Sequence, residues 1–373
     1  MRIDRLEFHD LDNDWHLEEV SFGKLSLLVG VSGAGKTRIL KAINTLFLIA
    51  NGYSFSGINW DIKFSIEKGV NYRWKGEFYQ NSKLPLNGRN GEDKTAILKS
   101  ENLWENGIPV FERTGSEIKF GAAPVPKLSQ EESLLVLLME EPTVMPAKNG
   151  FSKIIFPPST YDFNLLLSLS KPVNEHLLEA YNHIDIIRSG GLNLKLKLFF
   201  TSVHASHVFE EIKSDFANIF PLVEDIKSEP LPNYHIYGRE PVLQIKERHV
   251  NRWIPQTEIA QGMLKTLLLL AEIHLCPDGS VILIDEFENS LGVNCIDEVT
   301  AAIMSPGRDL QFIITSHHPY IINNIDMEYW KVVTRHGNTV KVLDAADLNL
   351  GKSRHTAFTQ LLNLEAYRTG VAA

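Results

Sequence analysis

The first apolar segments of the chain have the patterns of two strands followed by a helix. Ile3–Phe8 mixes apolar and charged residues as a half-exposed strand does, and Leu25–Val29 is the continuous apolar run typical of a buried strand. Arg38–Ala50 then repeats apolar residues at helical spacing. Residues 1–29 are therefore predicted to form two strands, and the second leads through residues 30–37 into a helix.

Three aspartates lie between these two strands. The spacing of Asp10, Asp12 and Asp14 resembles the start of a calcium-binding loop, but Trp15 occupies the position that requires Gly, and Ser21 the position that requires Glu. We therefore expect a hairpin turn here.

Residues 59–93 have the alternation of an antiparallel sheet followed by a loop. Trp60–Ile66 and Tyr72–Phe78 alternate apolar and polar residues and are separated by Lys68-Gly69, so they are predicted to be antiparallel strands. The segment rich in Pro, Gly and Asn that follows, Leu84–Asp93, is predicted to be a loop.

The next part of the chain is mostly helical in character. Ser129 and Glu132 have the spacing of a capping box in front of an apolar helix. The alternating leucines of Leu192–Leu198 fit a helix or a strand equally well. The predicted helices are Ser133–Met139, Asp162–Leu169, Val173–Ile187 and Phe209–Ile219.

The composition is that of an ordinary globular protein. Of 373 residues, 44% are hydrophobic and 22% are charged, which excludes disordered and fibrous classes. No apolar stretch approaches the roughly 20 residues that cross a bilayer, and the N-terminal sequence MRIDRLEFHD lacks the apolar core of a signal peptide. We therefore expect a cytoplasmic protein with no membrane partner.

The cysteines and the net charge bear on metal binding and on nucleic-acid binding. Cys276 and Cys295 lack the spacing of metal ligands, so they are expected to pack in the core. The net charge of −9 argues against a surface that is basic throughout, but it leaves open a local basic groove for nucleic acid.

The sequence GVSGAGKT fits the phosphate-binding pattern G-x-x-x-x-G-K-[ST] and lies between a predicted strand and a predicted helix, as the motif requires. Its glycines allow the backbone to turn its N–H groups toward phosphates, and the helix N-terminus favours the same anions. Lys36 is expected to reach the β- and γ-phosphates, and the Thr37 hydroxyl is expected to bind Mg²⁺. The candidate nucleotide contacts are Gly30, Val31, Ser32, Gly33, Ala34, Gly35, Lys36 and Thr37.

A second segment with catalytic character is Val281–Glu286, an apolar strand that ends in two carboxylates. Asp285 would hold Mg²⁺ at the carboxyl end of the strand, and Glu286 would polarise the attacking water. Taken alone, the pattern also fits a solvent-facing acidic pair after a core strand. Gln311–His317 is another apolar strand, and His317 at its end is suited to sensing a γ-phosphate.

The order of motifs along the chain is GVSGAGKT, Ile259–Thr266, VILIDEFENSL and FIITSHHP. In this order the chain resembles the ABC-type ATPase superfamily, specifically the cytosolic heads related to Rad50, SMC and RecF proteins and the OLD-like ATPases of bacterial defence systems. It is most similar to standalone AAA-family ATPases of antiphage defence. The resemblance covers residues 1–46 and about 240–345.

The resemblance implies an α/β fold. The expected fold is a P-loop NTPase of ABC-ATPase type, with a mostly parallel core sheet, an antiparallel β subdomain and a helical insertion. The corresponding divisions are an ATPase N-terminal lobe at 1–150, a mainly helical insertion at 151–230 and an ATPase C-terminal lobe at 231–373.

The resemblance also implies ATP and Mg²⁺ as cofactors. Gly262 in the signature segment would lie against the γ-phosphate of a second subunit, so two copies would form a head-to-tail homodimer or a higher oligomer. The catalytic residues would be Glu286 and the switch histidine His317, and Asn289–Leu291 would be the D-loop. The implied Mg²⁺ contacts are Thr37, Asp285 and the Q-loop residue Gln130.

The signature departs from the family pattern at one position. Ala260 stands where the family usually has Ser, so a hydroxyl that would bond the γ-phosphate is missing. A hydrogen bond to a charged group contributes about 1.5–3 kcal/mol. The same segment also has the pattern of an ordinary amphipathic helix with an apolar core face, and the two interpretations are compatible.

Two functions remain open. In the first, the chain is a defence ATPase that controls a separately encoded effector, such as a nuclease or a toxin. In the second, it is a RecF- or SMC-like repair or chromosome ATPase that binds DNA directly. The acidic charge and the compact insertion favour the first. Glu211 and Lys213 have the E-x-K spacing of some nucleases, but they lie in a predicted amphipathic helix and are expected to form a surface salt pair.

Overall fold

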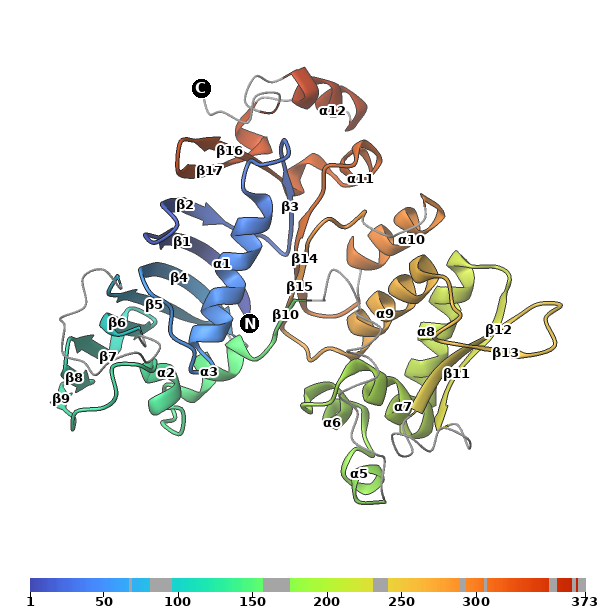
Figure 1. Cartoon of the computed structure of the whole chain (residues 1–373), viewed down its shortest axis with the longest axis horizontal. Coiled ribbons are helices and arrows are strands. Elements are labelled where there is room, and N and C mark those ends of the chain that lie inside the picture. The colour runs from blue at the N-terminus through green and yellow to red at the C-terminus, as the bar shows by residue number, and fades with distance from the viewer. Residues whose placement is uncertain are drawn as a thin grey trace, which may run out of the picture. The chain divides into compact units, whose positions relative to one another are not determined.

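The computed structural model describes residues 1–66, 69–80, 96–156, 175–230, 241–288, 293–304, 307–348, 354–363 and 367. The chain forms two compact units, whose elements are labelled in Figure 1. We call residues 1–156, 279–285 and 310–373 the sheet unit, and residues 157–278 and 286–309 the helical unit.

The sheet unit is built around one sheet of 14 strands in the order β10-β14-β15-β3-β16-β17-β2-β1-β4-β5-β6-β7-β8-β9. The strands are β1 (Arg2–Asp10), β2 (Trp15–Ser21), β3 (Leu25–Val29), β4 (Ile58–Ile66), β5 (Val70–Phe78), β6 (Leu98–Glu105), β7 (Ile108–Thr114), β8 (Glu117–Phe120), β9 (Ala123–Pro124), β10 (Ile154–Ile155), β14 (Ser280–Ile284), β15 (Leu310–Thr315), β16 (Trp330–His336) and β17 (Thr339–Asp344).

The strands β10, β14, β15, β3 and β16 pair in parallel and form the centre of the fold. Every residue of β3 is buried, as expected for a parallel strand that is covered on both faces. The apolar strands predicted at Leu25, Val281 and Gln311 are β3, β14 and β15. The expected mostly parallel core sheet is therefore confirmed.

The strands β2, β1 and β4 to β9 pair antiparallel and form the expected antiparallel subdomain. The predicted strands Trp60–Ile66 and Tyr72–Phe78 lie within β4 and β5, which pair without a register shift. The prediction of only two strands in residues 1–29 is wrong, because Trp15–Ser21 forms β2.

A bulge explains why β2 is hard to recognise in the sequence. The β1–β2 pairing shifts register between Leu6 and Phe8. On β2, the buried residues Leu17 and Val20 are consequently separated by two exposed glutamates, which breaks the alternation that marks a strand. The segment before β2 is the expected hairpin turn, in which the Asp10 carboxylate accepts hydrogen bonds from the backbone and side-chain amides of Asn13 at 3.0 and 2.8 Å.

Helix α1 (Lys36–Ile49) follows β3 and the phosphate loop, as predicted for Arg38–Ala50. One face of the helix is apolar, and its buried side chains belong to the same core cluster as the inner residues of the antiparallel strands. Figure 1 shows α1 lying across β1, β2 and β4. The apolar face of α1 is thereby packed on the sheet.

A buried carboxylate connects β6 to helix α2 (Leu134–Leu137). Glu101 accepts hydrogen bonds from the Trp74 indole at 2.9 Å, the Ser133 hydroxyl at 2.5 Å and the Leu134 backbone N–H at 2.7 Å. Burial raises the pKa of Glu101, and these hydrogen bonds and the nearby Arg113 charge oppose the shift. The satisfied network fixes the position of α2 on the sheet.

The predicted capping box in front of α2 is wrong. Ser133 is the N-cap, because its hydroxyl accepts from the Leu135 N–H. Ser129 and Glu132 instead use their backbone carbonyl oxygens to accept hydrogen bonds from the Arg113 guanidinium, at 2.9 and 3.0 Å. The Ser129 hydroxyl accepts from the Glu131 N–H at 3.2 Å, so it caps the turn before the helix and not α2 itself.

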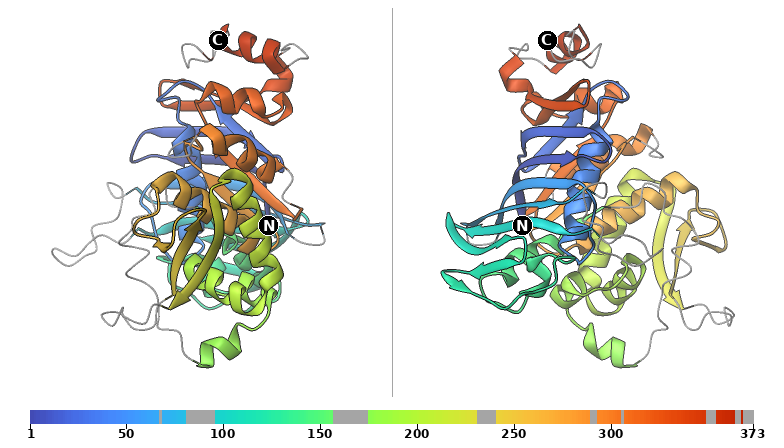
Figure 2. Two further views of the ribbon diagram at one scale, coloured as in Figure 1. Left: turned by 90° about the vertical axis from the view of Figure 1, so that its right-hand side faces the viewer. Right: turned by 60° about the vertical axis from the view of Figure 1, so that its left-hand side comes forward.

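The C-terminal part of the sheet unit adds short helices around β16 and β17. Helix α12 packs against α11 (Figure 2). The remaining helices of the unit are α3 (Met145–Phe151), α11 (Pro319–Asn324), α12 (Arg354–Asn363) and the 3₁₀ helices η3 (Met327–Tyr329) and η4 (Ala345–Leu348).

The helical unit combines helices with a three-stranded antiparallel sheet. Helices α7 and α8 pack on this sheet and on α9. The elements are α5 (Glu175–Ala180), α6 (Ile184–Ser189), α7 (Leu194–His204), α8 (Ser206–Ile219), β11 (Val223–Pro230), β12 (Pro241–Glu247), β13 (Trp253–Pro255), α9 (Gln261–Leu275) and α10 (Val293–Met304).

The structure decides the ambiguous leucine segment in favour of a helix. Asn193 caps α7, and its side-chain oxygen accepts from the Leu196 N–H at 2.9 Å. The predicted helix Phe209–Ile219 lies within α8. The predicted helix Val173–Ile187 instead covers α5 and the first part of a separate helix, α6.

A half-buried cation, Arg308, binds the C-terminal end of α9. The Arg308 guanidinium donates to the carbonyl oxygens of Ile273 and Cys276 at 2.8 and 2.6 Å, and to the Asp278 carboxylate at 2.6 Å. Cys276 and Cys295 are both buried, which confirms their expected core positions.

Some predictions fall on residues that the structure does not describe. They are the loop Leu84–Asp93, the helix Asp162–Leu169 and the D-loop at Asn289–Leu291. The three-part division of the sequence stays a prediction. A search of the described helices finds none with the length and apolar character needed to cross a bilayer.

Candidate nucleotide-binding site

The loop at residues 30–37 has a backbone that only glycine adopts readily. Gly30, Gly33 and Gly35 have φ values of 153°, 85° and 111°, and Gly35 is the left-handed N-cap of α1. Within the loop, the Ala34 N–H donates to the Val31 carbonyl oxygen at 3.2 Å. The first N–H groups of α1, which have no partner within the helix, consequently lie where the motif predicts phosphates.

Two of these glycines are also required by space. A Cβ atom at Gly30 would lie 2.6 Å from the carbonyl oxygen of Val333, and one at Gly35 would lie 2.9 Å from a methyl carbon of Val340. A Cβ at Gly33 meets nothing within 4 Å. The loop is therefore held closely against β16 and β17 at its two ends and is open in the middle.

Lys36 folds back over the loop. Its ammonium donates to the carbonyl oxygens of Gly30 and Val31 at 2.7 and 3.0 Å. This position places a positive charge beside the N-terminus of α1, where a phosphate would also be attracted by the helix.

The centre of the site is the Asp285 carboxylate at the end of β14. Its Oδ1 accepts hydrogen bonds from the Thr37 hydroxyl at 3.1 Å and the Thr315 hydroxyl at 2.7 Å. These three residues come from α1, β14 and β15, so the segments that carry the predicted Mg²⁺ ligands do meet in the folded chain. A carboxylate and hydroxyl oxygens fit Mg²⁺, which takes hard oxygen ligands and keeps several waters.

Glu286 and His317 follow the strands that end at this edge of the sheet. Glu286 is exposed and has a left-handed backbone with φ 48°, which is uncommon for a residue other than glycine. His317 is exposed and comes directly after the buried Ser316. Both side chains are accessible to a ligand, and their catalytic roles stay predictions.

Gly262 lies in the first turn of α9 in the helical unit. Ala260 is the N-cap of this helix, and no side chain caps its first turn. The alanine that departs from the family signature thus leaves the N–H groups of the first turn without a side-chain acceptor. Such a helix end favours an anion, and the role of Gly262 as an ATP contact stays a prediction.

The structure does not join Gln130 to the rest of the predicted site. It lies in the segment before α2, and its backbone carbonyl accepts from the Leu98 N–H at 2.8 Å. Among the described residues, the Asp285 carboxylate is hydrogen-bonded to Thr37 and Thr315 and not to Gln130. Its assignment as a Q-loop metal contact stays a prediction.

Sequence reasoning missed two features beside the phosphate loop. The first is Thr315, whose position inside an apolar strand gave no sign that its hydroxyl binds Asp285. The second is Trp15 of β2, whose ring lies 5.9 Å from the Arg38 guanidinium and borders Gly35. This contact could not be predicted, because the sequence pattern places Trp15 at a turn and not in β2.

The expected salt pair between Glu211 and Lys213 is wrong. Lys213 pairs with Asp225 at 2.7 Å and with Glu210 at 3.0 Å, and Glu211 lies 3.7 Å from His274. Glu211 and Lys213 thus have different partners, including His274 of α9 and Asp225 of β11.

Comparison with known proteins supports the ATPase interpretation of the fold. The profile of the family described as "AAA domain, putative AbiEii toxin, Type IV TA system" matches residues 152–323. This range contains the signature, Asp285, Glu286 and His317, and it excludes the phosphate loop. No curated protein matches the chain significantly in sequence.

Similar solved structures are heads of SMC proteins. An SMC head bound to the C-terminal winged-helix domain of ScpA has a TM-score of 0.55 at 14% identity, and the alignment covers 92% of this chain and 97% of the other. An SMC head with an extended coiled coil, bound to the C-terminal domain of ScpA derived from Pyrococcus furiosus, has a TM-score of 0.50 at 13% identity and coverages of 92% and 96%. The expected resemblance to ABC-type ATPase heads of the SMC and Rad50 kind is confirmed, and at these identities it concerns the fold.

The different surroundings of the loop glycines give a test of the loop geometry. Gly33→Ala should lower the free energy of unfolding by about 1–2 kcal/mol, because an alanine there has an unfavourable left-handed backbone but open space. Gly30→Ala should cost about 1–3 kcal/mol more, because its Cβ meets the rigid backbone of β16. Denaturant unfolding of the two variants measures the difference, and equal destabilisation would show that the loop does not pack on Val333 as described.

Proposed function

We propose, from the fold of an ABC-type ATPase head, that this chain binds Mg²⁺·ATP at residues 30–37 and hydrolyses it in a head-to-tail dimer. The observation that carries the proposal is the Asp285 carboxylate, which accepts hydrogen bonds from Thr37 after the phosphate loop and from Thr315 on the neighbouring strand. This arrangement brings the metal-binding residue types of a P-loop ATPase to one edge of the sheet.

Each residue of the proposed site has a distinct task. The loop N–H groups and Lys36 neutralise the phosphates of ATP, while Thr37 and Asp285 hold Mg²⁺. Glu286 accepts a proton from the attacking water, and His317 contacts the γ-phosphate. Glu286 is exposed, which is compatible with a site that is closed by a second subunit.

The second subunit would supply the N-terminus of α9. A lone chain leaves the γ-phosphate open to water, whereas a second copy would cover it with the uncapped first turn of that helix. The lower local dielectric would strengthen the contacts to the phosphate, so that ATP binding stabilises the dimer.

The output of this ATPase is proposed to be control of a separately encoded effector in antiphage defence. The match to the AbiEii-type family favours a toxin or defence context. The net charge of −9 is less suited to wrapping DNA than a basic surface would be. We accordingly place the protein in the cytoplasm, with a nuclease or toxin as the partner.

Direct DNA binding in repair or chromosome maintenance is the alternative, and the similarity of the fold to SMC heads favours it. DNA binding that weakens steeply with salt would support the alternative, because phosphate contacts release counterions. Salt-dependent DNA binding is therefore the property that separates the two functions.

Two substitutions separate ATP binding from hydrolysis. Lys36→Ala should lose ATP affinity, because its ammonium interacts with the phosphates in the ground state as well as in the transition state. Glu286→Gln should retain ATP affinity and lose about 10²–10⁴ in turnover, the usual contribution of a general base. Isothermal titration and steady-state phosphate release measure the two effects.

Lys24→Ala and Glu298→Gln are matched controls, since both side chains are exposed and lie outside the proposed site. Both controls should behave as the wild type. A Glu286→Gln variant that hydrolyses ATP at the wild-type rate would show that Glu286 is not the general base.

The shared site is tested by Gly262→Asp. A carboxylate in the first turn of α9 should repel the γ-phosphate and obstruct closure, so turnover and ATP-dependent dimerisation should be lost while the single subunit still binds ATP. Mass in solution is measured with Mg²⁺ and a slowly hydrolysed ATP analogue. Gly191→Asp is the control, because Gly191 is exposed in open space of the helical unit. Normal turnover of Gly262→Asp, or a wild-type monomer with concentration-independent turnover, contradicts the shared site.

A further inference from the structure

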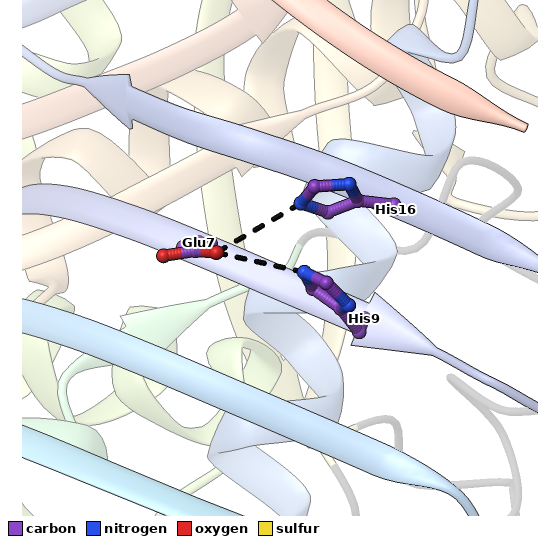
Figure 3. A group of neighbouring side chains, drawn as sticks. All are labelled: Glu7, His9 and His16. Carbon is purple, nitrogen blue, oxygen red and sulfur yellow. Dashed lines mark ion pairs between the residues drawn. The ribbon is translucent and has the colours of Figure 1, made fainter.

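The exposed face of the antiparallel strands carries two histidines and a glutamate that point toward one another (Figure 3). Glu7 and His9 lie two residues apart on β1 and therefore share a face, while Leu6 and Phe8 point into the core. His16 of β2 is the direct cross-strand partner of His9. The pleat and register of these strands thus bring the three side chains together.

The spacing of these three side chains is close to that of metal ligands. The Glu7 carboxylate oxygen Oε1 lies 3.5 Å from His9 Nε2 and 3.8 Å from His16 Nε2. One ligand atom from each residue lies within 4.8 Å of the other two. Tetrahedral zinc with bonds of about 2.0–2.1 Å separates its ligand atoms by about 3.4 Å. Small side-chain rotations would therefore bring all three onto one ion.

Two buried polar atoms at this place have no hydrogen-bond partner within the described part of the chain. They are His16 Nε2 and the side-chain oxygen Oδ1 of Asn59. Asn59 of β4 pairs with His9 in register and lines, with Glu7 and His9, a pocket of about 280 Å³. Leaving buried polar atoms unsatisfied is unfavourable, so a bound ion with its water would stabilise this part of the fold.

The neighbouring charges leave this group available. Asp61, which follows on β4, is held by the Arg73 guanidinium at 2.5 and 2.9 Å. Glu7 is thus the carboxylate that lies beside both histidines.

We propose that Glu7, His9 and His16 bind a divalent transition-metal ion, with zinc as the ion best matched to their chemistry. A water molecule occupies the remaining coordination position and donates a hydrogen bond to Asn59 Oδ1. Two imidazoles and one carboxylate select such an ion over Mg²⁺, whereas the oxygen ligands around Asp285 select Mg²⁺. The ion cross-links β1 to β2, one residue from Trp15, whose ring lies against Arg38 of α1.

The experiment titrates Zn²⁺ into the whole, tag-free chain in the absence of nucleotide. The buffer contains excess Mg²⁺, which occupies sites that prefer oxygen ligands. Calorimetry gives the affinity and stoichiometry, and the visible absorption of Co²⁺ reports the coordination geometry. We expect one Zn²⁺ per chain. His9→Gln and His16→Gln should each weaken binding by about 10–100-fold or more.

Matched controls separate this site from other metal contacts. His207→Gln removes an exposed histidine of α8, and Asp285→Asn removes the proposed Mg²⁺ ligand, so both should keep the wild-type Zn²⁺ affinity. Circular dichroism without metal checks that each variant is folded. If a histidine variant does not fold, Glu7→Gln takes its place.

Equal Zn²⁺ affinity in the wild type and in folded His9→Gln or Glu7→Gln overturns the proposal. Loss of Zn²⁺ binding in Asp285→Asn alone also overturns it, because the ion would then occupy the nucleotide site. Neither result bears on ATP hydrolysis, so the zinc proposal and the proposed function can fail separately.

Discussion

The arrangement of the candidate nucleotide site depends on one carboxylate. Asp285 accepts hydrogen bonds from Thr37 at the start of α1 and from Thr315 on β15, and in this way it joins the phosphate loop to two parallel strands. A half-buried carboxylate held by two hydroxyls has a defined orientation, which a metal ligand requires. The edge where parallel strands end is also where α/β proteins place their ligands.

Close packing around the loop maintains this arrangement. Gly30 and Gly35 have no room for a side chain, because Val333 and Val340 lie against them. The loop connects β3 to α1 near the start of the chain. Its position is fixed by contacts with β16 and β17, which lie near the end of the chain. Trp15 of β2 also lies beside the loop, next to Gly35 and Arg38. A strand of the antiparallel subdomain therefore also supports the phosphate loop.

Much of the fold could be predicted because the strands and motifs near the site follow simple local patterns. The spacing of apolar residues is enough to recognise the buried strands at Leu25 and Val281 and the helix that begins at Lys36. The errors arose where distant contacts override the local pattern. A bulge between Leu6 and Phe8 breaks the alternation of β2, and Ser133, which is hydrogen-bonded to the distant Glu101, caps α2 in place of Ser129. The hydrogen bond from Thr315 to Asp285 joins residues at the ends of adjacent strands that are far apart in sequence. No local sequence pattern therefore predicts it.

The most direct measurement of the central claim is the effect of Mg²⁺ on ATP affinity in Asp285→Asn. The amide has the shape of the carboxylate, and its oxygen can still accept the hydrogen bonds from Thr37 and Thr315, but it lacks the charge that holds the metal. The account predicts that Mg²⁺ increases the ATP affinity of the wild type and that the variant, with an unchanged unfolding temperature, loses most of this increase. An undiminished Mg²⁺ effect in the folded variant would contradict the assignment of Asp285 as the metal ligand.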